Sequence, residues 1–259
     1  METQIVSATG TTSRHSANST KCHLENSSCF DFLPTIQDET TDLVLIDPPY
    51  DISRKTGFQS CNKGVQRLAV SMDFGDWDWG FQGLDEVIKQ TFRALRKGGT
   101  LIVFYDLWKI SELAKWITDA GFKQLRFIEW VKTNPVPLNS KTNYLTNSRE
   151  IALVAVKGGK PTFNSSYDNG IYQYPICHEE GRFHPTQKPL PLIRELIEKH
   201  SRQGDLVVDC FSGSATTAAA AIDTGRNFAG CELSPEYWKK GYERLQRKAG
   251  HRVILSGDE

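Results

Sequence analysis

The sequence predicts an α/β fold, a doubly wound, mostly parallel, Rossmann-like sheet with one inserted segment. Short apolar runs alternate with stretches whose apolar residues recur at helical spacing, as in sheets built from β-α-β units. The strand-like runs are apolar throughout, which is typical of strands buried on both faces of a parallel sheet. Polar residues follow directly after several of these runs, at the edge where open parallel sheets bind ligands.

The composition is that of a globular protein. The 259 residues are enough for one large domain, with 39% apolar and 24% charged residues. Lys+Arg and Asp+Glu balance at 31 each, so a polyanionic partner would have to meet a local basic patch. No apolar run approaches the roughly 20 residues that span a bilayer, and the first residues lack a secretory signal. We therefore expect a cytoplasmic protein without a membrane partner.

The N-terminal part carries few signals. Residues 1–20 are rich in Ser and Thr and are expected to form a flexible arm. A short strand or turn is predicted around residues 29–33, with Asp31 near its end. The six cysteines are scattered and no two lie at zinc-ligand spacing, so we expect reduced, structural thiols and no metal site.

The apolar run 43–46 ends at Asp47-Pro48-Pro49-Tyr50, at the mouth of the predicted crevice. An ionised Asp47 only accepts hydrogen bonds, and prolines have no N–H, so the backbone here offers carbonyl acceptors. Two acceptors beside an exposed ring suit a flat group that donates two N–H bonds. A plain strand followed by a proline turn is the alternative.

Residues 51–80 show no periodicity and contain Arg54 and Lys55. Long irregular loops in compact domains are usually functional or mobile. This loop is expected to cover the crevice or to contact a phosphate backbone, and a plain surface loop is the alternative.

The middle of the chain continues the alternation. A helix is predicted from Leu84 to Leu95, ended by Gly98-Gly99. Strands at 101–104 and 125–131 flank a second amphipathic helix that Gly121 closes. Within residues 132–183, only 151–156 reads as a strand. The rest, rich in Asn, Pro, Lys and Tyr, is expected to be a loop suited to stacking, or a solvated excursion.

Two stretches further on have the form of ligand-binding turns. His184 to Pro189 precedes a helix, and Lys188 near that helix N-terminus favours a carboxylate or phosphate, although a simple cap is the alternative. The strand 205–209 leads through small residues into an alanine-rich helix, an arrangement that brings backbone close to a nucleotide-like ligand. The next strand ends at Glu232, where an acid usually meets a ribose diol.

Taken in order, these motifs resemble the amino-group DNA methyltransferases in the permuted arrangement called the β group. Asp47 to Tyr50 matches their catalytic tetrapeptide, and 184–189 and 209–216 look like their two methyl-donor motifs. The resemblance runs from about residue 25 to residue 248. One departure is Ala215, where the family usually has a second glycine. Alanine costs little there unless φ is positive.

The resemblance implies transfer of a methyl group from S-adenosylmethionine to the exocyclic N6 of an adenine flipped out of DNA. Asp47 and the Pro48 carbonyl would accept the two amine hydrogens, and Tyr50 would stack on the base. The catalytic residues implied are thus Asp47, Pro48, Pro49 and Tyr50.

Further roles follow from the same resemblance. Asp209 would meet the donor's amino group, Glu232 its ribose and Asp31 its adenine. The donor-binding set is Asp31, Thr186, Lys188, Asp209, Phe211, Ser212, Gly213, Ser214 and Glu232. The expected DNA contacts are Arg54, Lys55, Lys132, Asn134 and Lys141.

Several alternatives stay open. The nearest is the same reaction on cytosine N4, although the family tends to use Ser in place of Asp47 for cytosine. Methylation of RNA or a protein amide usually goes with Asn at that position. A Rossmann dehydrogenase would need a third glycine, and a DNA-binding module would not need three acids at strand ends.

The expected division of the chain is an arm (1–20), a catalytic half (25–131), a strand with a target-recognition segment (132–183) and a donor-binding half (184–250). The partner implied is DNA. A homodimer and a companion restriction endonuclease are further partners that the resemblance leaves open.

Overall fold

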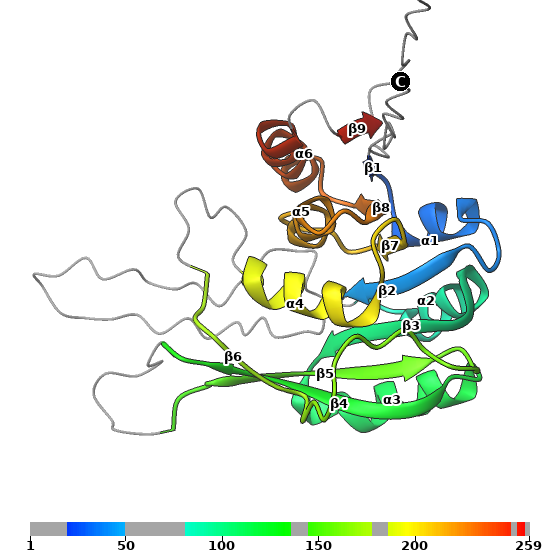
Figure 1. Cartoon of the computed structure of the whole chain (residues 1–259), viewed down its shortest axis with the longest axis vertical. Helices are drawn as coiled ribbons and strands as arrows, with labels where there is room; N and C mark the ends of the chain where they lie inside the picture. Colours follow the sequence, from blue (N-terminus) through cyan, green and yellow to red (C-terminus); the bar gives the residue numbers. More distant parts are fainter. Residues whose placement is uncertain (1–19, 50–80, 136–144, 178–185, 250–252, 257–259) are drawn as a thin grey trace, which may run out of the picture.

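The computed structural model describes residues 20–49, 81–135, 145–177, 186–249 and 253–256. In this part of the chain, nine strands form one sheet (Figure 1). They are β1 (Thr20–Asn26), β2 (Thr41–Ile46), β3 (Leu95–Tyr105), β4 (Lys123–Lys132), β5 (Arg149–Val156), β6 (Ile171–Tyr174), β7 (Leu206–Asp209), β8 (Asn227–Glu232) and β9 (Val253–Ser256).

The strand order is β6-β4-β5-β3-β2-β7-β8-β1-β9. All neighbouring pairs from β3 to β9 are parallel, whereas β5 runs antiparallel to both β3 and β4. The sheet grows outward in both directions from the adjacent strands β2 and β7, which makes their boundary the topological switch point. The predicted doubly wound, mostly parallel sheet is confirmed.

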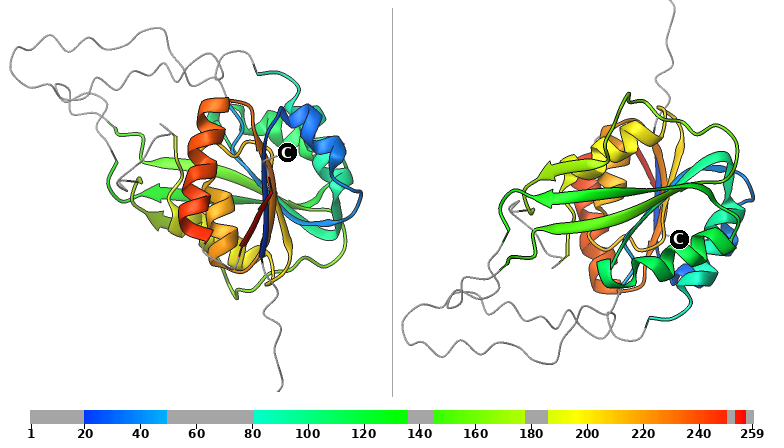
Figure 2. Two further views of the ribbon diagram at one scale, coloured as in Figure 1. Left: turned by 90° about the horizontal axis from the view of Figure 1, so that it is seen from above. Right: turned by 90° about the horizontal axis from the view of Figure 1, so that it is seen from below.

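Helices cover both faces of the sheet (Figure 2). One face carries α1, α2 and α3, and the other carries α4, α5 and α6. Their bounds are α1 (Cys29–Phe32), α2 (Leu84–Ala94), α3 (Ile110–Asp119), α4 (Leu190–His200), α5 (Thr216–Asp223) and α6 (Pro235–Ala249).

Strand β2 explains why an apolar run without alternation forms the centre of the sheet. Successive side chains of a strand point to opposite faces. Leu43 and Leu45 therefore pack in the core beneath α4 and α5, while Val44 and Ile46 pack in the core beneath α2 and α3. All four side chains are buried, and each contributes roughly 1.5–3 kcal/mol.

The structure differs from the sequence predictions at several elements. Residues 29–32 form a helix rather than a strand or turn, because the Ser28 hydroxyl accepts the Asp31 N–H and caps it. Helix α2 ends at Ala94, before Gly98. A Cβ on Gly98, at φ +80°, would lie 2.6 Å from the Lys160 carbonyl oxygen, so this glycine serves an irregular stretch of β3. Strands β1, β6 and β9 were not predicted.

Several predictions fall on residues outside the described ranges. These are the arm up to residue 19, the loop 51–80, the end of the tetrapeptide at Tyr50, and residues 136–144 and 178–185, which include His184 and Pro185 of the predicted turn. Among the described helices, none is both long and apolar enough to cross a membrane. The five described cysteines are free and buried, and burial raises the pKa of Cys22 to about 12.

Candidate active site

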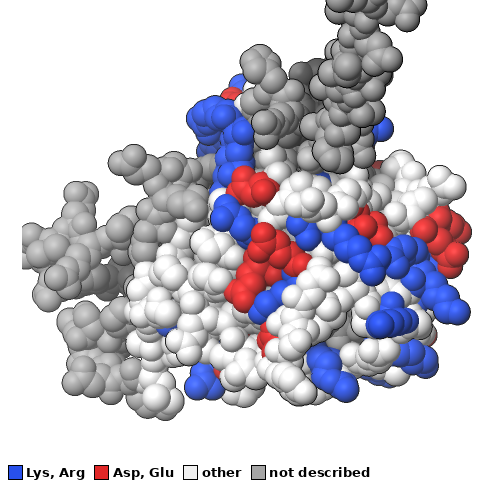
Figure 3. All heavy atoms as spheres, viewed as in Figure 1, with Lys and Arg blue, Asp and Glu red and all other residues white. Residues whose placement is uncertain are grey.

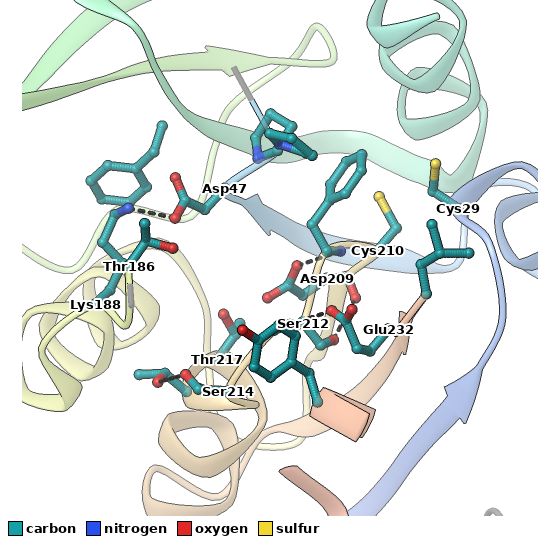
Figure 4. A pocket seen from close by; sticks show the side chains of 18 of the residues that line it. Cys29, Asp47, Thr186, Lys188, Asp209, Cys210, Ser212, Ser214, Thr217 and Glu232 are labelled. Carbon is teal, nitrogen blue, oxygen red and sulfur yellow. Dashed lines mark hydrogen bonds and ion pairs between the residues drawn. The ribbon is translucent and has the colours of Figure 1, made fainter. Parts of the chain in front are cut away.

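A cavity of about 220 Å³ lies at the carboxyl ends of β2, β7 and β8, at the switch point (Figure 4). Each of these strands places one acid in its wall, Asp47 after β2, Asp209 at the end of β7 and Glu232 at the end of β8. The three carboxyl groups therefore meet in one cavity, although they come from distant parts of the chain.

Asp47 lines this cavity, and one of its two carboxylate oxygens has a hydrogen-bond partner among the described residues. Its Oδ2 accepts a hydrogen bond from the Lys188 ammonium. Its Oδ1 is buried without a hydrogen-bond partner among the described residues. Burial raises the pKa of the Asp47 carboxyl, the neighbouring Lys188 charge opposes this shift, and Glu150 adds to it. Pro48 is buried beside it and Pro49 is half-buried, which leaves little freedom to the backbone that carries the acid.

Lys188 connects Asp47 to a second acid. Its Nζ lies 3.1 Å from Glu150 Oε2 and 5.1 Å from the centroid of the Phe104 ring. On the other side of Glu150, Lys132 Nζ lies 2.8 Å from Oε1. Burial acts to raise the pKa of Glu150, but the two ammonium groups outweigh it and hold that pKa below its usual value. Two acids and two lysines thus form a largely buried quartet that carries no net charge when all four groups are ionised.

Asp209 is almost fully buried, at 3% exposure. Its Oδ1 accepts the Phe211 N–H at 3.0 Å, and the Thr217 hydroxyl also hydrogen-bonds to the carboxyl. Burial is the main reason that the pKa of Asp209 rises to about 7, and the Asp47 and Glu232 charges add to it. A cation bound beside these acids would relieve this cost.

Glu232 braces the turn between β7 and α5. Its Oε2 accepts the Gly213 N–H at 2.7 Å, and its Oε1 accepts the Ser234 N–H at 2.9 Å. Burial raises its pKa. The turn lies tightly against β8, since a Cβ on Gly230 would lie 2.8 Å from the Ser212 Oγ.

The turn residue Ala215 has φ 58° and ψ 32°, the left-handed conformation. This is the case in which alanine is costly, by roughly 1–2 kcal/mol relative to glycine. Its side chain is fully buried, and a Cβ placed on Gly241 of α6 would lie 3.1 Å from the Ala215 Cβ. The turn keeps its form at this position although the second glycine is missing.

Aromatic rings form another part of the cavity wall. Phe30 stacks on Phe81 with centroids 6.1 Å apart, and Phe81 meets Phe211 edge-on at 5.4 Å. Of these three rings, only Phe211 was predicted from the sequence. Phe30 and Phe81 lie outside the recognised motifs, and only the folded chain brings them together.

Most of the predicted donor-binding residues line this one cavity. With Asp47, Pro48 and Pro49, they are Thr186, Lys188, Asp209, Phe211, Ser212, Gly213, Ser214 and Glu232. Lys188 also lines the cavity, but the carboxylates that it contacts belong to the protein itself, to Asp47 and Glu150.

Three predicted residues lie elsewhere than expected. Asp31 is exposed and absent from the cavity wall, and its Oδ2 accepts the Ser28 hydroxyl at 2.6 Å. Lys132 points into the protein toward Glu150, with 12% of its side chain exposed. Asn134 Oδ1 accepts the Ile176 N–H at 2.6 Å, which ties two chain segments together. Tyr50, Arg54, Lys55 and Lys141 fall outside the described residues.

Glu150 makes a contact at the site that was not predicted from the sequence. The antiparallel strand β5 begins at the edge where the parallel strands end, and Tyr105 pairs with Ile151 there. Glu150 thereby reaches the edge of the sheet that carries the cavity from the opposite direction. The only signal in the sequence was an acid directly before an apolar strand. To place that acid at the site, one must know the direction in which the strand runs.

The fold and cavity define a class, the Rossmann-like proteins that bind a nucleotide-like ligand at the switch point of the sheet. Three acids in one cavity further favour a ligand that carries positive charge. A model of a DNA methylase family, comprising N6- and N4-methyltransferases, matches residues 41–243. The chain belongs to this family, and it is a DNA methyltransferase.

Similar proteins agree with this assignment. Type II methyltransferase M2.DpnII of Streptococcus pneumoniae is 33% identical over 88% of this chain and 91% of its own length. M2.LlaDCHI of Lactococcus lactis subsp. cremoris is 32% identical over 87% and 90%. The crystal structure of an M1.HpyAVI-SAM complex has a TM-score of 0.66 at 27% identity and covers 86% of this chain and all of that one. The cytosine-N4-specific PvuII methyltransferase shares the fold, with a TM-score of 0.66 at 18% identity, covering 93% and 96%.

Proposed function

We propose that this chain methylates the exocyclic N6 of adenine in DNA, with S-adenosylmethionine as the methyl donor. The observation that carries the proposal is Asp47, which lines the same cavity as Asp209 and Glu232 and whose Oδ1 has no hydrogen-bond partner among the described residues. An acceptor for the target amine and the acids for a cationic donor are therefore adjacent.

The cavity fits S-adenosylmethionine in its charge and its walls. The donor supplies a methyl group on a positively charged sulfur, and it also carries an amino group. Burial raises the pKa of Asp209 and of the partly buried Glu232, and a cation would offset the charges of both. Asp209 would hold the amino group and Glu232 the ribose hydroxyls. The small-residue turn from Ser212 to Ser214 would let the methionine part approach the backbone.

The Asp47 end of the cavity fits an aromatic amine. The N6 lone pair of adenine is delocalised into the ring, so the amine is a poor nucleophile. Asp47 Oδ1 would accept one of its hydrogens and the Pro48 carbonyl the other, which concentrates electron density on nitrogen. Catalysis would then consist mainly of positioning. Tyr50, next in the sequence, is proposed to stack on the flipped base.

The proposed division of labour follows the chain. Residues 25–131 supply the acceptor side and 184–250 the donor side, while 132–183 would contain the sequence-reading segment. Arg54, Lys55 and Lys141 are the proposed phosphate or base contacts. Membership in a restriction-modification system, with a companion endonuclease, is proposed from the Type II relatives.

Incubation with DNA and radiolabelled S-adenosylmethionine, followed by nucleoside analysis, tests the proposal. We expect N6-methyladenine, and N4-methylcytosine as the only product would contradict the adenine assignment. Asp47→Ala should lower transfer by at least about a hundredfold while donor affinity stays nearly unchanged. Equal loss of transfer and donor binding would contradict the role of Asp47.

Asp106→Ala is the matched control for this experiment. Asp106 follows β3 as Asp47 follows β2, on the neighbouring strand, but it does not line the cavity. Its carboxylate accepts the Trp108 N–H at 2.9 Å at the start of a short 3-10 helix, η3 (Leu107–Lys109). Methyl transfer should therefore survive this substitution.

A further inference from the structure

The quartet of Asp47, Lys188, Glu150 and Lys132 contains two residues for which the proposed reaction has no direct use. Glu150 and Lys132 lie behind Lys188, on the side away from Asp47. Between 7% and 24% of each of the four side chains is exposed. Desolvation offsets much of the attraction within ion pairs that are so little exposed. Stability alone therefore does not explain why these residues are paired here.

Their positions follow from the sheet. Glu150 stands opposite Trp130 across the β4–β5 ladder, and Lys132 ends β4 two residues later. The ladder is anchored at this edge, because Trp130 is buried at 2% exposure and its indole N–H donates to the Tyr174 carbonyl at 2.9 Å. The Lys132 ammonium also lies 5.3 Å from the centroid of the Trp130 ring. Glu150 is thereby held at a fixed place behind Lys188.

We propose that Glu150 is a positioning residue for methyl transfer, which together with Lys132 holds the Lys188 ammonium against Asp47 Oδ2. The ammonium occupies Oδ2 and leaves Oδ1 to the target amine. It also balances the Asp47 charge, so that the acid remains an acceptor inside a cavity that otherwise favours its neutral form. The inference deepens the proposed function and rests on it.

The charges that act on Asp47 have opposite effects. Lys188 and Lys132 lower its pKa, whereas burial and the Glu150 charge raise it. A further charged neighbour is Asp209 across the cavity, whose own pKa the Asp47 charge raises. Removing Lys188 should therefore make Asp47 harder to ionise, and removing the charge of Glu150 should make it easier.

The test measures kcat against pH at saturating donor and DNA, a profile that reports groups in the bound complex. Lys188→Met should move the acid limb upward by about 1–3 pH units, and Glu150→Gln should move it downward by about one. Glu150→Gln should also lower kcat about tenfold, because the ammonium loses one of its charged partners. Lys188→Arg should restore the limb toward the wild-type position.

A second readout does not depend on turnover. A ¹³C NMR titration of labelled aspartate carboxyls, with Asp47 assigned by its absence in Asp47→Asn, should show the same two opposite shifts. Glu129→Gln is the matched control. Glu129 pairs with Arg149 at 3.2 Å on the same two strands but lies outside the quartet, so neither readout should move.

Opposite shifts of the limb and of the Asp47 titration, together with a lowered kcat plateau in Glu150→Gln, support the inference. Opposite shifts with an unchanged plateau would show that Glu150 acts through its charge alone and would overturn it. Lower activity with an unshifted limb and titration in both variants would reduce Glu150 to a structural part and overturn it. If the wild-type protein transfers no methyl group to DNA, the proposed function fails and the inference with it. An active wild type with unshifted variants overturns the inference alone.

Discussion

Burial of acidic side chains explains why the cavity favours a cationic ligand. Asp209 is almost fully buried and Glu232 is partly buried, and burial raises the pKa of each carboxyl. Such a site is less stable without its ligand than one with neutral side chains. A bound cation would offset the charges of these acids, so the free energy lost by burying them would be recovered on binding.

This cost has a predictable pH dependence for Asp209. Between about pH 4 and 7, the folded protein keeps the Asp209 proton that the unfolded chain releases. The unfolded state then binds fewer protons, so the free energy of unfolding falls as pH rises through this window. Asp209→Asn should therefore raise the Tm of the donor-free protein at pH 8, flatten its decline with pH and abolish tight donor binding.

Thermal denaturation from pH 4 to 8 checks this prediction, with calorimetric titration of S-adenosylmethionine for the binding part. Asp205→Asn serves as the control, because that acid begins the same strand region but only accepts the Arg202 N–H at 2.8 Å. A Tm for Asp209→Asn below that of the wild type at pH 8 would refute the expected role of burial.

Packing between neighbouring elements compensates for the missing glycine. The left-handed Ala215 precedes α5, and its methyl group occupies space that Gly241 leaves open on α6. Glycine in the middle of a helix costs about 1 kcal/mol relative to alanine. The contact between α5 and α6 thus places an alanine where glycine is preferred and a glycine where alanine is preferred.

Exchanging the two residues should stabilise the protein. Gly241→Ala alone brings two Cβ atoms to 3.1 Å, and Ala215→Gly alone leaves an unfilled space. The double variant relieves the turn, improves the helix and refills the space. We expect the change in the free energy of unfolding of the double variant to exceed the sum of the two single changes by about 0.5–3 kcal/mol. A double-mutant cycle measured by urea denaturation gives this difference. Strict additivity would show that the two positions do not share this space.

Charge over the entire protein is balanced, and this limits how it can hold DNA. On the face shown in Figure 3, basic and acidic side chains are intermixed. The 31 basic and 31 acidic residues leave no net attraction for a polyanion. Affinity for DNA must therefore come from a few local contacts.

Arg54 and Lys55 are the candidates that we expect to matter most. Their reversal to Glu should weaken DNA binding and reduce the slope of log K against log salt by about 0.9 for each phosphate that is no longer neutralised. Fluorescence anisotropy with labelled duplexes between about 50 and 200 mM salt measures this slope. Lys115→Glu, on α3, is the control, since Lys115 pairs with Asp119 within its own helix. An unchanged slope in the double reversal would remove the loop from the interface.

The sequence predicted a structural feature when the cause of that feature lies in neighbouring residues of the chain. Asp47, Asp209 and Glu232 were found because each follows an apolar strand, and parallel strands end at one edge. The segment 29–33 was predicted as a strand or turn, because the Ser28 side chain that caps a helix there looks like an ordinary polar residue. Glu150 needed the reversed direction of β5, which nothing within that strand reveals. The consequence of Ala215 depended on φ, which the residue type alone does not determine.

Strand β1 lies between β8 and β9, and Asn26 contacts Glu232 across 206 positions of the chain. During synthesis, β1 therefore leaves the ribosome long before its neighbours β8 and β9 have been made. Until β8 emerges, the early segment carries unpaired edges that invite other chains. Closing a loop of this length also makes the pairing slow to nucleate. Synthesis at reduced temperature, or with a chaperone that shields this strand, should accordingly favour correctly folded product over aggregate.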